Sequence, residues 1–296
     1  MTLHPQARKA VENAAGAVPV TDPAFDIAAE RERDRRAAAE QRGPEVAEVR
    51  DVDAGGVPAR LYLPEGYDAV VVHAHGGGFV FNDVEVHDAA VRRFADLSRM
   101  AVLSVDYRRP PEHRFPAAPD DVSTATRWLD DQPDLAGLPT FAHGDSAGGN
   151  LALVAALRHP GRFTGVALIY PFLDPTASFD SYRTAADGFD PAEAAWYWQQ
   201  YAATPADLAH PDLAPLLSDA LGTLPPTLVA TAEHDPLRDE GEHLVHLLAE
   251  AGVEVVGTRY LGQVHGFWRH TQVFDAAEPL MWQVAGWMRM QAARAR

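Results

Sequence analysis

The sequence predicts an α/β fold in which helices flank a mostly parallel sheet of eight strands. Short apolar runs, of the kind found in buried strands, alternate along the chain with helical patterns, and this alternation is typical of βαβ crossovers. The chain has 296 residues, of which 47% are hydrophobic and 23% are charged. This is an ordinary globular composition, and a chain of this length can bury a large core.

The first two strands are predicted to form a hairpin. Residues 46–53 alternate between apolar and polar side chains, Ala54, Gly55 and Gly56 interrupt the pattern, and the alternation resumes over residues 57–63. Two alternating runs around a glycine-containing turn indicate antiparallel strands. Six further strands are expected at short apolar runs, which cover residues 69–74, 101–105, 140–143, 165–170, 227–232 and 253–260.

Helices are predicted between these strands, where apolar residues recur at helical spacing. They cover residues 87–100, 120–129, 151–157, 238–251 and 276–290.

Two segments stand outside this alternation. Residues 28–42 are dense in Ala, Arg and Glu, which favour helix, and predict either a solvated helix or part of a lid. Residues 174–218 are too long for one crossover and contain the aromatic-rich stretch 194–201. They predict either an extra helix that packs its aromatic side chains on the core or an insertion that walls a binding pocket.

The composition argues against several classes of function. The chain has no cysteine, so it has no disulfide, no thiolate metal site and no cysteine nucleophile. Its formal net charge of −17 would repel nucleic acid and anionic membrane surfaces. We find no signal peptide and no apolar run near the roughly 18 residues of a membrane span, and we therefore expect a cytoplasmic protein without membrane insertion.

A serine stands in a glycine-rich turn between a predicted strand and a predicted helix. Residues 144–148 read Gly-Asp-Ser-Ala-Gly, which is the G-x-S-x-G pattern of a nucleophile elbow in its expected context. So tight a turn needs Gly144 and Gly148 because larger side chains would collide, and the helix N-terminus favours negative charge near Ser146. We expect Ser146 to be a nucleophile; the alternative is a glycine-rich turn with an incidental serine.

A serine hydroxyl is a weak nucleophile that needs a base and an orienting carboxylate. In the fold that carries such an elbow, the carboxylate and then the histidine follow the serine along the chain. Asp235 and His265 each come shortly after a predicted strand, so both fall at the same edge of the sheet as Ser146. We expect His265 as the base and Asp235 as its orienter, with Glu233 and Asp239 as rival carboxylates.

A second glycine-rich loop follows the third predicted strand. Residues 75–79 read His-Gly-Gly-Gly-Phe, and the three glycines let backbone N–H groups turn inward without side chains in the way. Such a loop supplies oxyanion-hole amides in serine hydrolases. A phosphate site or a simple turn is the alternative, but no G-x-x-x-x-G-K-[ST] pattern accompanies the loop.

Taken together, these motifs resemble those of the hormone-sensitive-lipase-like carboxylesterases, a bacterial family of α/β hydrolases. The matching segments are HGGGF at 75–79, GDSAGGN at 144–150, DPLRDEG at 235–241 and HGF at 265–267, with DYR at 106–108, PEH at 111–113 and FPAA at 115–118. The resemblance runs from about Leu61 to Trp268.

The resemblance implies both the site and the domain organisation. The implied site consists of Ser146 as nucleophile, Asp235 as orienter, His265 as base, and oxyanion amides from Gly77, Gly78 and Ala147. The implied fold is that of an α/β hydrolase with a helical cap. Residues 1–45 would form N-terminal cap helices, and residues 46–296 the catalytic domain, with a cap insertion at about 174–218. The resemblance also allows a homodimer.

Three positions depart from the family pattern. The chain has Arg109 and Pro110 where the family has small or aliphatic residues, and Asn82 where a glycine is usual. These positions lie on loops near the expected pocket mouth, so they bear on substrate preference rather than on the reaction. A structural polar cluster is expected from three further residues: Asp106, Arg108 and Glu112.

The sequence thus predicts a serine carboxylesterase that hydrolyses small or short-to-medium acyl esters through an acyl-enzyme, without a metal or cofactor. The same triad would serve an amidase, a lactonase or an acyltransferase; a non-catalytic small-molecule-binding protein of this fold is disfavoured because all three triad residues are present. Phe79, Trp196 and Tyr201 are expected to contact substrate. Spacing alone leaves open which cap aromatics (Tyr197 and Trp198 included) face the pocket.

Overall fold

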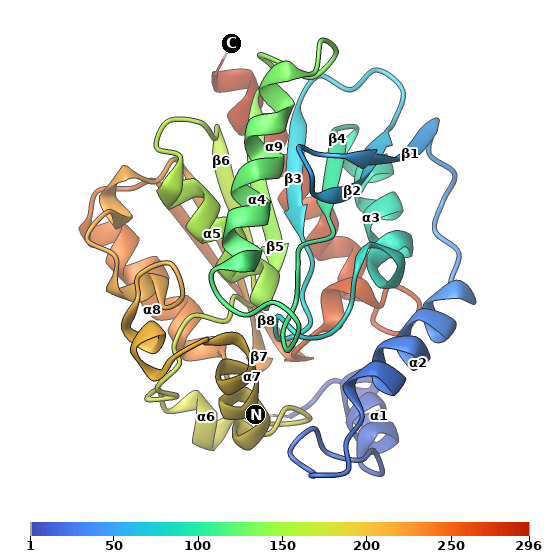
Figure 1. Cartoon of the computed structure of the whole chain (residues 1–296), viewed down its shortest axis with the longest axis vertical. Helices are drawn as coiled ribbons and strands as arrows, with labels where there is room; N and C mark the ends of the chain where they lie inside the picture. Colours follow the sequence, from blue (N-terminus) through green and yellow to red (C-terminus); the bar gives the residue numbers. More distant parts are fainter. Residues whose placement is uncertain (1, 296) are drawn as a thin grey trace.

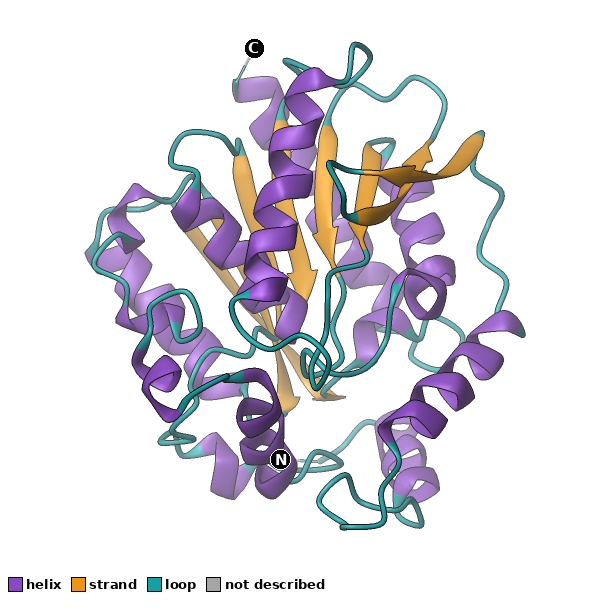
Figure 2. Cartoon of the chain, viewed as in Figure 1, coloured by secondary structure: helices purple, strands orange, loops and turns teal. Residues whose placement is uncertain are grey.

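The computed structural model describes residues 2–295, in which helices cover both faces of a central eight-stranded sheet (Figures 1 and 2). The strands are β1 (Glu48–Asp53), β2 (Pro58–Leu63), β3 (Val70–Ala74), β4 (Ala101–Val105), β5 (Thr140–Asp145), β6 (Gly165–Ile169), β7 (Thr227–His234) and β8 (Val255–Val264). Their spatial order is β1-β2-β4-β3-β5-β6-β7-β8. β1 and β2 pair as the predicted hairpin, and the strands from β4 to β8 run parallel. The prediction of a mostly parallel eight-stranded α/β fold is confirmed.

The helices connect these strands and frame the sheet. The α-helices are α1 (Pro5–Ala14), α2 (Ile27–Ala39), α3 (Val84–Ser98), α4 (Ala117–Trp128), α5 (Ala147–Arg158), α6 (Ser181–Thr184), α7 (Pro191–Tyr201), α8 (Arg238–Glu250) and α9 (Ala277–Arg294). Short 3₁₀ helices lie at Leu129–Asp131, Pro205–Ala209, Pro215–Leu217, Leu221–Thr223 and Phe267–Arg269. Three helices begin earlier than predicted. α3 begins at Val84 because the Asp83 carboxylate caps it by accepting the Val86 N–H. α4 begins at Ala117, and α5 begins directly after Ser146.

Alternation along the buried strands gives the sheet two apolar faces. In β3, Val70 and Val72 pack in one cluster with residues of α4, α5 and α8, while Val71 packs in a second cluster with residues of α3 and α9. Figure 1 shows α4 and α5 in front of the sheet and α9 behind it. With both faces buried, the strands read as continuous apolar runs, which is why their positions could be predicted.

Two segments lie beneath the carboxyl ends of the parallel strands, at the lower edge of the sheet in Figure 1. One is the N-terminal segment with α1 and α2, and the other is the insertion 174–218 with α6 and α7. The Arg31 side chain ties α2 to the loops that follow β3 and β4, because it donates to the Val80 carbonyl at 2.9 Å and to the Glu112 carboxylate at 2.9 Å. Across residues 2–295, none of the helices combines the length and apolar character needed to cross a bilayer.

Candidate active site

Ser146 lies at the sharp turn between β5 and α5. Its backbone is held at φ 55° and ψ −121°, a strained conformation for a residue with a side chain. The turn brings backbone atoms so close that a methyl group at Gly144 would lie 2.1 Å from the Gly148 carbonyl oxygen. One at Gly148 would lie 2.0 Å from the Ala74 carbonyl oxygen. Only glycine fits at these two positions. The tight turn that they allow holds Ser146 at the edge of the sheet.

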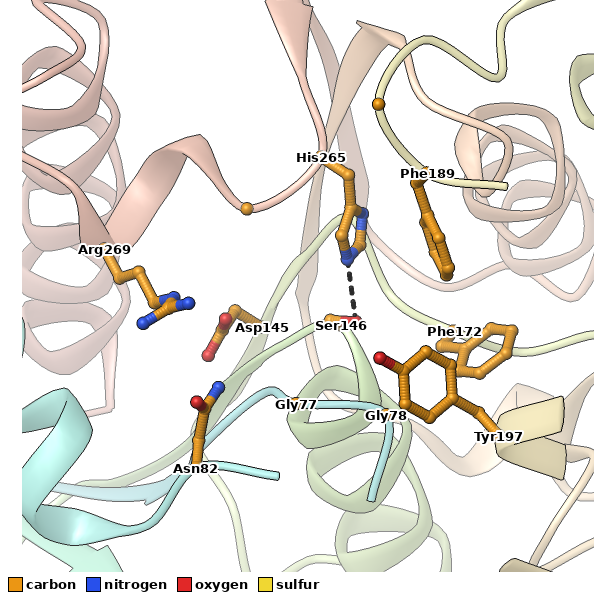
Figure 3. Close-up of a pocket in the computed structure, with 12 residues that line it drawn as sticks. Gly77, Gly78, Asn82, Asp145, Ser146, Phe172, Phe189, Tyr197, His265 and Arg269 are labelled. Carbon is orange, nitrogen blue, oxygen red and sulfur yellow. Dashed lines mark hydrogen bonds between the residues drawn. The ribbon is translucent and has the colours of Figure 1, made fainter. Parts of the chain in front are cut away.

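The structure joins Ser146, His265 and Asp235 in one chain of hydrogen bonds. The Ser146 Oγ lies 2.9 Å from His265 Nε2, and His265 Nδ1 lies 2.7 Å from Asp235 Oδ2 (Figure 3 draws the first of these contacts). Asp235 is fully buried, and its other oxygen accepts the Leu237 N–H at 2.9 Å. With the proton on Nδ1, the His265 ring presents a lone pair on Nε2 to the serine hydroxyl.

The rival carboxylates are engaged elsewhere. Glu233 accepts the Gly262 N–H at 2.7 Å, and Asp239 accepts the Ser181 N–H at 2.9 Å and pairs with Arg238. The choice among the three carboxylates therefore follows from the loop after β7, which turns Asp235 alone toward the histidine.

The three residues expected to supply oxyanion amides belong to the loop after β3 and to the start of α5. Gly77 and Gly78 line the same cavity as Ser146, and Ala147 is the first residue of α5. Among the hydrogen bonds within residues 2–295, none uses the N–H of these three residues, so all three donors are available to a ligand. Gly77 has φ +125° and Gly78 has φ +58°, conformations that the glycine-rich loop permits.

A cavity of about 190 Å³ opens at Ser146. Its lining comes from the loop after β3, the elbow, the segment directly after β6, the insertion and the segment after β8: Gly77, Gly78, Asn82, Asp145, Ser146, Phe172, Gly188, Phe189, Tyr197, His265, Gly266 and Arg269. Figure 3 shows Tyr197, Phe172 and Phe189 on one side of Ser146, with Asn82, Asp145 and Arg269 on the other. The cavity therefore has an aromatic wall and a polar wall.

The aromatic residues expected from the sequence lie behind this lining. Phe79 and Tyr201 are fully buried and stack on each other with ring centroids 3.8 Å apart, and Trp196 stacks on Phe81. The residue of α7 that reaches the cavity is Tyr197. The physical reason is the helical repeat: Tyr201 lies on the core-facing stripe of α7, while Tyr197 lies beside that stripe.

The polar wall contains Asn82, which the sequence placed near the pocket mouth, and two residues that sequence reasoning missed, Asp145 and Arg269. Burial raises the pKa of the Asp145 carboxyl to about 6, an effect that the nearby Arg269 partly offsets. Asp145 also accepts the Gly76 N–H at 2.9 Å. Asn82 has φ 62°, a left-handed conformation that glycine and asparagine adopt more readily than other residues, and its amide donates to the Gly76 carbonyl at 3.0 Å. Asp145 stood inside a recognised motif, but no local pattern pointed to Arg269.

The three polar residues expected to form one cluster instead bind separate partners. Asp106 pairs with Arg109 at 3.4 Å, Arg108 with Asp121 at 2.7 Å, and Glu112 with Arg31 at 2.9 Å. They hold the loops after β4 in place, and none of the three lines the cavity at Ser146.

The sheet order, the elbow and the hydrogen-bonded serine, histidine and aspartate define the class of the protein as an α/β hydrolase. The family described as alpha/beta hydrolase fold matches residues 71–269. The chain belongs to this family, among the hormone-sensitive-lipase-like carboxylesterases that its motifs resemble.

Relatives and solved structures agree with this assignment. The chain is 38% identical to the carboxylic ester hydrolase LipN of Mycobacterium tuberculosis, over 82% of this chain and 70% of that protein. It is 33% identical to the ethyl acetate hydrolase of Pseudomonas putida, over 76% of each chain. The structure of an esterase from Pyrobaculum calidifontis superposes with a TM-score of 0.89 at 36% identity, covering 99% of both chains.

Proposed function

We propose that this protein is a serine carboxylesterase in which Ser146, His265 and Asp235 form the catalytic triad. The observation that carries the proposal is the pair of contacts at 2.9 and 2.7 Å that joins the three side chains at the cavity. The names of the relatives, which include carboxylic ester hydrolase and ethyl acetate hydrolase, support the ester as substrate class.

In the proposed reaction, Ser146 Oγ attacks the ester carbonyl carbon while His265 Nε2 takes its proton. Asp235 holds the imidazole through Nδ1–H and stabilises the imidazolium that forms. The carbonyl oxygen becomes an oxyanion, which the free amides of Gly77 and Gly78 and the amide of Ala147 stabilise. Collapse of the tetrahedral intermediate breaks the bond to the alcohol, which leaves with the proton from Nε2. Water then attacks the acyl-enzyme by the same steps and releases the acid.

The cavity favours a small substrate. Its volume of about 190 Å³ is below the roughly 300–1,000 Å³ of sites that enclose drug-sized ligands. Phe172, Phe189 and Tyr197 close the side where an acyl or alcohol chain would extend. We therefore propose short acyl esters, of about two to six carbons, as the preferred substrates.

The test is hydrolysis of p-nitrophenyl esters graded by acyl length. Wild type should show an optimum at short chains, and Ser146→Ala should lose turnover while keeping its circular dichroism spectrum. A fluorophosphonate should add one covalent mass at Ser146 in wild type and none in Ser146→Ala. Retained turnover in the alanine variant would refute the nucleophile. An amide of the same acyl group, a lactone and an alcohol acceptor run in parallel would separate esterase from amidase, lactonase and acyltransferase.

Oligomeric state and location remain predictions. β8 is an edge strand whose Val256 and Leu261 are exposed, and such an edge can pair with a second copy. This supports the predicted homodimer, which light scattering on the purified protein would test. The predicted cytoplasmic location would be tested by fractionation of the source cells.

A further inference from the structure

A cluster of buried histidines lies behind the elbow. His73 and His143 come from the neighbouring strands β3 and β5, His75 follows β3, and His87 comes from α3. All four side chains are at most 1% exposed. Among the atoms of residues 2–295 that are buried without a hydrogen-bond partner, five belong to this cluster: His73 Nε2, His75 Nε2, both ring nitrogens of His87, and His143 Nε2.

Unpartnered polar atoms are rare in protein interiors because burial without a partner is unfavourable. One such atom is unremarkable in a large protein, but here five imidazole nitrogens gather around one point of the sheet. An imidazole nitrogen that has no hydrogen-bond partner can offer its lone pair to a metal ion, and histidine is the commonest metal ligand in proteins.

Asp145 completes a donor set with two of these histidines. His73, His87 and Asp145 each offer one ligand atom, and the three atoms lie within 4.8 Å of one another. His87 Nδ1 and the Asp145 Oδ1 are 3.7 Å apart. Ligands about 2.1 Å from a tetrahedral ion are themselves roughly 3.4 Å apart, so coordination would draw these atoms together, by up to about 1.4 Å for the pair that is farthest apart. Two imidazoles and a carboxylate are a ligand combination that Zn²⁺ accepts.

The surroundings of these three residues resemble the outer shell of a metal site. The Nδ1 atoms of His73 and His143 lie 2.9 Å apart, so one hydrogen bond can hold the His73 ring with its Nε2 free. The Gly76 N–H fixes the Asp145 carboxylate at 2.9 Å. Metal-binding histidines and carboxylates are commonly oriented by contacts of this kind. Asp145 also lines the cavity at Ser146, which provides a route by which an ion can reach the cluster.

We propose that His73, His87 and Asp145 bind a divalent transition-metal ion, with Zn²⁺ as the ion that fits the donors, in a structural site behind the nucleophile. The ion would link β3, α3 and β5 beneath the elbow. The ester hydrolysis proposed above uses no metal, so either proposal can fail without affecting the other.

The first test uses wild-type protein without an affinity tag. After chelator treatment and gel filtration, the protein is loaded with Zn²⁺, filtered again and analysed by mass spectrometry of the metal content. We expect about one zinc ion per chain and a rise in melting temperature of roughly 5 °C at a hundredfold excess over the dissociation constant. Co²⁺ in the same site should give visible absorption bands of a four- or five-coordinate ion. This test needs no variant, so it does not depend on how a substitution affects folding.

The second test assigns the ligands. His73→Gln and His87→Gln should each lose the bound ion, and His143→Ala should weaken binding by roughly 10–100-fold because it orients His73. His246→Gln is the matched control, since His246 is exposed on α8, and Ser146→Ala should bind as wild type does. Wild type that retains no ion, or His87→Gln that retains the same amount, would overturn the proposal and leave water as the partner of these nitrogens.

Discussion

The proposed oxyanion role of the loop after β3 gives a sharp prediction at Gly77, which lines the cavity and whose N–H makes no hydrogen bond within residues 2–295. A methyl group on Gly77 would lie 2.4 Å from the Phe81 carbonyl oxygen and 2.8 Å from the Phe81 carbonyl carbon. Its φ of +125° is also one that side-chain-bearing residues rarely adopt. Gly77→Ala therefore cannot keep the native loop.

The size of the effect follows from these distances. Real Cβ contacts are not shorter than 3.0 Å, so the loop must move by about 0.6 Å to relieve the contact of 2.4 Å. Catalytic groups need placement within about 0.5 Å, so this movement removes one oxyanion donor. Loss of one donor lowers kcat by roughly 10²–10³, or about 2.7–4 kcal/mol in activation free energy. KM should change little, because the donor acts on charge that develops in the transition state.

The assay is steady-state hydrolysis of p-nitrophenyl acetate, with circular dichroism and thermal melting to show that the variant is folded. Gly56→Ala is the matched control. Gly56 also has a positive φ, +93°, but no atom lies within 4 Å of the added methyl group, and it sits in the β1–β2 turn away from the cavity. It should keep full activity. A folded Gly77→Ala with kcat within about threefold of wild type would refute the oxyanion role of this loop.

Three further predictions concern the cavity wall, the orienter and a buried acid. Tyr197→Ala should open the aromatic wall and raise kcat/KM for p-nitrophenyl octanoate relative to acetate by at least about tenfold; Trp196→Ala, outside the lining, should leave the ratio unchanged. Asp235→Asn should lower kcat by roughly 10⁴-fold with the fold intact, because the wrong histidine tautomer faces Ser146; a loss below tenfold would contradict this role. Burial raises the pKa of Glu240 well above its ordinary value, so the folded protein keeps a proton that the unfolded chain releases. The free energy of unfolding then falls as pH rises from the ordinary carboxyl pKa to the raised one. Glu240→Gln should remove that fall, so the melting temperature of the variant should gain on that of wild type as pH rises above the ordinary glutamate pKa of about 4. A difference independent of pH would show that Glu240 is ionised in the fold.

Much of the fold could be predicted because its determinants are local. Strands β3 to β7 are buried along their whole length, so each appears in the sequence as a short run of mostly apolar residues. A parallel sheet also brings the carboxyl ends of its strands to one edge. The positions of Asp235 and His265 after their strands therefore predict that both lie near Ser146. The hairpin was equally local, because its glycine turn lies between two alternating runs.

The parts of the site that the sequence did not settle depend on the directions of side chains, and tertiary packing sets those directions. Glu233, Asp235 and Asp239 share one short segment, and the sequence ranked them only by position; the turn after β7 decides which carboxylate faces His265. In α7, the spacing of Ala194, Trp198 and Tyr201 indicates a stripe that faces the core. This spacing favours packing on the core for Tyr201 over contact with substrate. Arg269 had no such signal, since it lies in an irregular turn whose direction follows from the packing of Phe267 and Trp268.

The order of the sheet explains why the proposed oxyanion loop after β3 lies next to the elbow. β4 separates them in sequence, yet β3 lies directly beside β5, with Ala74 paired to Gly144. The loop after β3 and the turn after β5 therefore start from adjacent positions, and the Gly76 N–H to Asp145 contact at 2.9 Å binds one to the other. Gly148 packs its backbone on Ala74 at the same point. The distance from the donors to Ser146 is thus set by strand pairing and close backbone contact, without help from the insertion. Substitutions in the insertion should accordingly change which ester is preferred, whereas substitutions at the elbow or the oxyanion loop should change kcat for every ester.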